Sequence, residues 1–61
     1  MTKEDFRRWR LTLDMTQADA AKALGRGKRL VESYERGEQD IPLYIELAAE
    51  ALLLRHQRDA A

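Results

Sequence analysis

Apolar residues recur at intervals of three or four positions along most of the chain. Phe6, Trp9 and Leu13 are spaced as on one face of a helix, which predicts a first helix over residues 3–13. The segment Thr-Lys-Glu-Asp at 2–5 resembles a capping box that would begin this helix. Because neither a period-2 alternation nor an Asn-Gly or Asp-Gly turn occurs, we expect no β-strand.

Two short helices are predicted in the middle of the chain. Thr16 is a good N-cap for an alanine-rich helix over residues 17–24. Gly25 suits the left-handed position that ends a helix, and Gly27 is a weaker N-cap for a basic helix over 28–36. Helices this short are unstable alone in water, so packing must hold the pair together. Four small residues would allow close helix approach: Ala18, Ala20, Ala21 and Ala23.

The third helix is predicted to have one apolar and one polar side. Val31 and Tyr34 lie three residues apart and face inward with Leu24, completing the expected core. The opposite side is polar and carries Lys28, Arg29, Glu32, Ser33 and Arg36. A short, rigid helix with an exposed polar face has the geometry needed to enter the major groove of DNA.

A last helix is predicted over about residues 42–57, and Pro42 suits its first position. At about 100° per residue, its core face carries Ile45, Ala48, Ala49 and Leu52. The opposite face is also apolar and carries Leu43, Leu47, Ala51 and Leu54. Because a helix that is apolar on two sides must bury both, a two-fold homodimer is predicted. The alternatives are that the first helix covers part of this face or that the leucines stay exposed.

The composition limits the kinds of function. Sixty-one residues make a single domain over 1–61, without cysteine and with one histidine, so no metal site or cofactor is expected. No carboxylate pair, nucleophile–base arrangement or phosphate-binding glycine loop is present, so neither an enzyme nor a small-molecule substrate is expected. The chain has no apolar run of membrane-spanning length and its start, MTKEDFRRWR, is not a signal peptide, which predicts a cytoplasmic protein without a membrane partner.

The charge is distributed unevenly. The formal net charge is zero, but residues 1–36 carry nine Lys/Arg against six Asp/Glu, a net of +3, and residues 37–61 carry a net of −3. Such asymmetry is compatible with a nucleic-acid surface on one side of the molecule.

Residues 16–37, TQADAAKALGRGKRLVESYERG, resemble the helix-turn-helix of the Cro/C1-type (XRE family) DNA-binding domains. The similarity is carried by Thr16-Gln17, Ala21, Leu24-Gly25, Val31 and Tyr34-Glu-Arg-Gly37, with Arg10 ahead of them. It covers about residues 5–54. The resemblance implies an all-α, lambda-repressor-like fold of four or five helices, with the helix-turn-helix at about 16–36.

The resemblance also implies roles for individual residues. The residues expected to point toward the base edges are Lys28, Arg29, Glu32 and Ser33. Those expected to contact DNA phosphates are Gln17, Arg26 and Arg36. Arg10 and Glu35 correspond to an internal salt bridge between the first and third helices. The chain departs from the family pattern at Arg26, Gly27 and Leu30, where small or apolar, hydroxyl and polar residues respectively are common.

The roles of Glu32 and Leu30 are left open by the sequence. Lys28 and Arg29 suit guanine, where arginine pairs with O6 and N7. Glu32 can accept from cytosine N4 or instead pair with Arg29 or Lys28, and the pairing is slightly favoured. Leu30 can touch a thymine methyl group or pack on the second helix.

The sequence therefore predicts a homodimeric DNA-binding transcriptional regulator, a repressor at an inverted-repeat operator, in a bacterium or its phage. The first alternative is an antitoxin-like interaction module that holds a partner protein through the face of Leu43, Leu47 and Leu54. The second is a purely structural helical dimer that binds no duplex.

Overall fold

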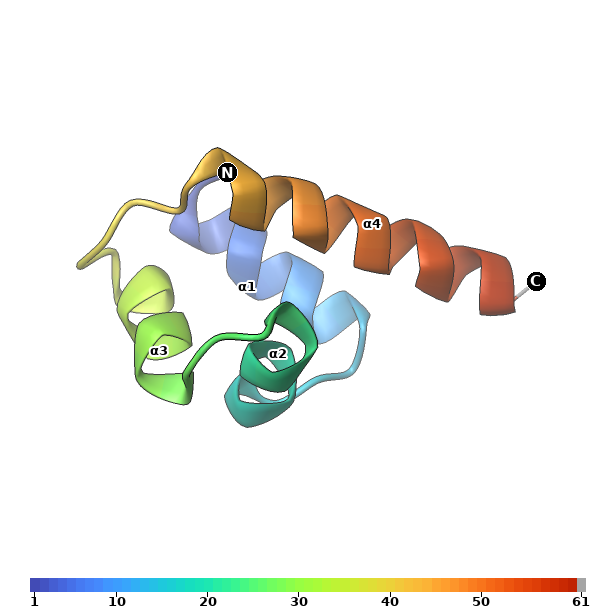
Figure 1. Cartoon of the computed structure of the whole chain (residues 1–61), viewed down its shortest axis with the longest axis horizontal. Coiled ribbons are helices and arrows are strands. Elements are labelled where there is room, and N and C mark those ends of the chain that lie inside the picture. Colours follow the sequence, from blue (N-terminus) through green and yellow to red (C-terminus); the bar gives the residue numbers. More distant parts are fainter. Residues whose placement is uncertain (61) are drawn as a thin grey trace.

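The computed structural model describes residues 1–60, which form four α-helices and, within that range, no β-strand. The helices are α1 (Lys3–Thr12), α2 (Gln17–Leu24), α3 (Lys28–Arg36) and α4 (Leu43–Ala60). Figure 1 shows α4 along the upper edge of the molecule, the short helices α2 and α3 at the lower edge, and α1 between them. The C-terminal half of α4 extends beyond the other helices.

Capping boxes begin α1 and α2. The Thr16 hydroxyl accepts from the Asp19 N–H at 3.1 Å, and the Thr16 N–H donates to Asp19 Oδ2 at 3.1 Å. Thr2 and Asp5 make the equivalent bonds at the start of α1, as the sequence predicted. The bond from the Thr16 backbone lowers the pKa of Asp19, and the same bond from Thr2 lowers that of Asp5. The stabilisation that these carboxylates provide is therefore present above their unfolded pKa and lost as pH falls through the folded pKa.

Left-handed residues end the first three helices: Asp14 (φ 57°), Gly25 (φ 70°) and Gly37 (φ 76°). After each of them the next residue donates its N–H to the carbonyl five positions earlier, at 3.1, 2.9 and 2.9 Å respectively. These bonds satisfy carbonyl groups that a helix end would otherwise leave free. The first helix thus stops at Thr12 rather than at residue 13, because the chain already turns at Leu13 and Asp14.

The bounds of α4 also differ from the prediction. Pro42 lies just before the helix rather than in it, and its carbonyl accepts from Ile45 and Glu46 at 3.0 and 3.2 Å. At the other end α4 continues to Ala60, about a turn beyond the predicted residue 57. The described residues hold no fifth helix.

The core is small and joins all four helices. The buried residues are Phe6, Trp9, Ala20, Ala21, Val31, Tyr34, Ile45 and Ala49. Of the residues expected in the core, Leu13, Leu24 and Leu52 are only partly buried but pack against this cluster. Only two of the four alanines of α2, Ala20 and Ala21, pack closely in the core. Ala18 and Ala23 are exposed. The reason is the helical period, which turns positions 18 and 23 away from the face that carries 20 and 21.

An aromatic cluster connects α1 to α3 and α4. The Phe6 ring centroid lies 5.2 Å from that of Trp9, in tilted geometry, and 5.7 Å from that of Tyr34, in edge-to-face geometry. The Trp9 indole donates Nε1–H to the Ala49 carbonyl at 2.8 Å, a buried bond to α4. Tilted aromatic pairs stabilise by about 0.5–1.5 kcal/mol beyond their area burial. Burial raises the pKa of the Tyr34 phenol, which keeps it neutral in the core.

The two glycines of the α2–α3 turn should respond oppositely to substitution. Gly25→Ala should lower the free energy of unfolding by about 1 kcal/mol, because φ +70° is unfavourable for a residue with a Cβ. Gly27→Ser should raise it by a few tenths of a kcal/mol, because φ is −80°, space is open and serine can cap α3. Urea unfolding followed by circular dichroism would measure both changes. Equal destabilisation by the two variants would contradict this account of the turn.

Candidate nucleic-acid interface

The polar side of α3 is directed away from the core. Lys28 and Arg29, on the first turn of the helix, are exposed, and so is Arg36 at its end. Glu32 and Ser33 lie between them and are half-buried. The five residues predicted on this side therefore do share it, and we call them the outward face of α3. Val31 and Tyr34 hold the opposite side in the core, where they are 0% and 2% exposed.

Three charged side chains of the outward face have no intramolecular partner. Within residues 1–60, no hydrogen bond or ion pair involves the side chain of Lys28, Arg29 or Glu32. The pairing of Glu32 with Arg29 or Lys28, slightly favoured from the sequence, is thus absent. An exposed pair gains little Coulomb energy and costs side-chain entropy, so its absence has a simple physical reason.

Arg36 differs from the other basic residues of this face. Its Nε lies 2.9 Å from Glu38 Oε1, in the turn that follows α3. Both side chains are 57% exposed, so the pair contributes about 0–1 kcal/mol and can be exchanged for another anion at small cost. Sequence reasoning placed Arg36 toward a phosphate and missed this partner, although a carboxylate two residues later was visible.

The other two predicted phosphate contacts lie at opposite ends of α2. Gln17 is the first residue of that helix and is half-buried. Arg26 is exposed in the middle of the turn between α2 and α3. Leu30, which the sequence left open, is partly buried against the core and is not part of the outward face.

A largely buried ion pair positions α3 relative to the rest of the molecule. Arg10 of α1 donates from Nε to Glu35 Oε2 at 2.6 Å and from its second terminal nitrogen to Oε1 at 3.0 Å. A third bond runs from Arg10 to the Met15 carbonyl at 2.9 Å, in the connection between α1 and α2. The two side chains are only 12% and 8% exposed. One guanidinium group thus joins α1, the following loop and α3.

The second apolar face of α4 is open to solvent. Leu43, Leu47 and Leu54 are 67%, 53% and 66% exposed, and Ala51 beside them is exposed as well. Tyr44, which sequence analysis did not include, is adjacent on the helix and 56% exposed. Because Tyr44 precedes Leu47 by three residues, the sequence could have indicated that the two side chains lie next to each other on α4. More than half of the surface of each leucine is thus left uncovered by α1.

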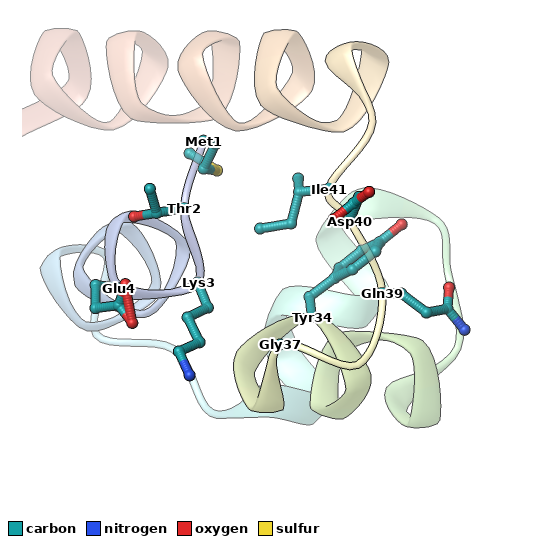
Figure 2. A pocket seen from close by; sticks show the side chains of 9 residues that line it. All are labelled: Met1, Thr2, Lys3, Glu4, Tyr34, Gly37, Gln39, Asp40 and Ile41. Carbon is teal, nitrogen blue, oxygen red and sulfur yellow. The ribbon is translucent and has the colours of Figure 1, made fainter.

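A cavity of about 380 Å³ lies on the side of the molecule where α1 begins and α3 ends. Figure 2 shows Tyr34 rising from α3 beside the Asp40–Ile41 backbone, while Lys3 reaches toward the turn at Gly37. A Cβ at position 37 would lie 3.1 Å from Lys3 Cδ, so this glycine also makes room for the lysine. No sequence pattern marked this cavity. Among the described residues there is no group of three or more histidine, cysteine or carboxylate side chains that could hold a metal ion.

Comparison of the chain with protein-family models, with curated proteins and with solved structures finds no match. Over residues 1–60, no helix combines the length and apolar character needed to cross a membrane.

Loss of one partner of the buried ion pair should unfold much of the protein. Arg10→Met or Glu35→Leu alone leaves an uncompensated charge, which costs about 3–5 kcal/mol. A domain of this size is stable by roughly 3–9 kcal/mol in total. The double variant Arg10→Met/Glu35→Leu should recover most of the loss, because hydrophobic replacement of a whole pair is often neutral. Thermal unfolding by circular dichroism tests both, and two single variants as stable as the parent would contradict the assigned role.

Proposed function

We propose that this chain is a Cro/C1-type helix-turn-helix protein that binds double-stranded DNA in a sequence-specific manner and regulates transcription, as a homodimeric repressor at an inverted-repeat operator. The observation that carries the proposal is the outward face of α3. Lys28 and Arg29 are exposed on it without an intramolecular partner. The major groove is wide enough to admit an α-helix. Unpaired cationic side chains on such a helix can bind phosphates and the edges of bases.

The way α3 is held supports the same proposal. A helix of nine residues is unstable alone, but Val31 and Tyr34 fix one side of α3 in the core and Glu35 is bound by Arg10. Base readout needs side chains that are held in register, since each good contact discriminates by about 1–3 kcal/mol. In this proposal α3 is the recognition helix and α2 supports it.

Phosphate contacts would position the recognition helix. Gln17 and Arg26 lie at the two ends of α2, where donors could reach the DNA backbone on either side of the groove. Arg36 would join them by exchanging Glu38 for a phosphate, which its exposure permits. The net charge of −3 over residues 37–61 suits a part of the chain that faces away from DNA.

The open face of α4 supports dimerisation. Leu43, Leu47 and Leu54 each leave more than half of their surface in water, and Ala51 between them allows close helix approach. Covering these leucines with a second copy would remove apolar surface from water. A two-fold dimer would also present two α3 helices to two half-sites about one DNA turn apart.

The same exposed leucines favour a second candidate function. An antitoxin-like module would use Leu43, Leu47 and Leu54 to hold a different protein, with DNA binding as a secondary activity or absent. The two candidates differ in what they require of α3. Only the regulator needs the free cations of the outward face.

DNA binding is tested by selecting bound sequences from a random duplex pool and then measuring the affinity of the protein for the most enriched sequence. Arg29→Ala should weaken binding to that sequence by about five- to 140-fold, since one base contact contributes about 1–3 kcal/mol. Affinity of the parent protein should fall steeply with salt, because phosphate binding releases counterions. Fluorescence anisotropy of a labelled duplex gives both quantities.

Arg7→Ala provides the matched control, because it removes the same charge from an exposed position on α1. It should change affinity much less than Arg29→Ala. An enriched sequence bound equally well by both variants would contradict the assignment of α3, and the absence of any salt-sensitive duplex binding would contradict the proposed function.

The dimer is tested by Leu47→Glu, which should give a monomer because it places a charge in the apolar face of α4. Leu11→Glu is the matched control, since Leu11 on α1 is 56% exposed and Leu47 is 53% exposed. Sedimentation equilibrium should report a dimer for the parent chain and for Leu11→Glu. If Leu47→Glu remains a dimer, the interface lies elsewhere.

A further inference from the structure

Arg29 and Glu32 are neighbours on the outward face of α3, three residues apart. This spacing normally allows an ion pair on a helix surface, yet no such pair forms within residues 1–60. Arg29 is exposed and Glu32 is half-buried, so the two groups have different access to solvent. Both keep their hydrogen-bonding capacity available for a bound partner.

A carboxylate on a DNA-reading face needs a particular partner. Phosphates repel it, and neither Lys28 nor Arg29 pairs with it in the described part of the chain, so a donor on a base edge is the partner that DNA offers it. The major groove offers two kinds of amino donor, cytosine N4 and adenine N6. Adenine places the N7 acceptor beside its amino group, which repels a carboxylate, whereas cytosine places a C–H there. Glu32 is thereby suited to cytosine.

Resting on the proposed function, we infer that the outward face of α3 recognises two adjacent G·C pairs, with Arg29 bound to guanine O6 and N7 and Glu32 accepting from the N4 amino group of a neighbouring cytosine.

The helix geometry accounts for the adjacency. Three residues advance about 4.5 Å along a helix, and successive base pairs lie about 3.4 Å apart. Arg29 and Glu32 therefore reach neighbouring pairs when α3 lies along the groove. Because Val31 and Tyr34 are buried on the other side, α3 cannot rotate about its axis, and Arg29 and Glu32 keep their order along the groove.

A first experiment compares the sequences selected from a random duplex pool by the parent chain and by Glu32→Ala. The parent should enrich half-sites with two consecutive G·C pairs. Glu32→Ala should keep the guanine preference and lose the preference at the adjacent pair, by on the order of ten-fold. Glu4→Ala on α1 removes the same charge from an exposed site and should leave the selected sequence unchanged.

A second experiment isolates the predicted hydrogen bond. N4-methylcytosine retains Watson–Crick pairing but replaces the major-groove N4–H by a methyl group. Placed at the predicted cytosine, it should weaken binding of the parent about ten-fold, as measured by anisotropy, and should not weaken binding of Glu32→Ala. The same substitution at a cytosine outside the half-site should have no effect on either protein.

The outcomes separate this inference from the function on which it rests. Enrichment of a half-site without adjacent G·C pairs, or full affinity for the methylated duplex, would overturn the inference while leaving sequence-specific binding intact. Failure of the parent chain to enrich any sequence would overturn the proposed function and this inference with it. Circular dichroism of Glu32→Ala verifies that a change in selection does not result from unfolding.

Discussion

The buried guanidinium of Arg10 is the constraint on which the arrangement of the short helices depends. It binds both oxygens of Glu35 and the Met15 carbonyl, so it joins α1, the loop before α2 and α3 at a single point. Burying an ion pair is costly in desolvation, and the three hydrogen bonds of Arg10 offset part of that cost. With Glu35 bound by Arg10 and with Val31 and Tyr34 buried, the outward face of α3 is directed to solvent.

The aromatic cluster of Phe6, Trp9 and Tyr34 adds a second connection between the helices, beside the ion pair of Arg10 and Glu35. Phe6 contacts both Trp9 and Tyr34, and Trp9 in turn donates to the Ala49 carbonyl. Apolar packing supplies free energy but little direction, whereas the indole hydrogen bond fixes where α4 crosses α1. A chain of 61 residues buries only a thin core, so a few directed bonds have a large share in specifying the fold.

The same shortage of core explains the character of α4. Ile45 and Ala49 are buried, but no part of the described chain remains to cover Leu43, Leu47 and Leu54 on the other side. Lys28 and Arg29 on the outward face of α3 are likewise free, because an ion pair with Glu32 on the helix surface would gain little Coulomb energy and would cost side-chain entropy. The molecule thus has two unsatisfied surfaces on different helices, one basic and one apolar, as the proposed binding of DNA and of a second copy would require.

Local rules were sufficient to predict the four helices, their caps and most of the core from the sequence. Thr2, Thr16 and the glycines at 25 and 37 act through their own backbone and the next few residues, and helical periodicity separates Val31 and Tyr34 from the polar face. The family resemblance implied the pair of Arg10 and Glu35, but the tertiary structure decided how the other charges of α3 pair. Glu35, Glu32 and Glu38 look alike in the sequence, yet one is buried against Arg10, one is free and one holds Arg36. Pairing depends on the distance between the charged groups and on their burial, and both follow from packing and local turns rather than from residue type.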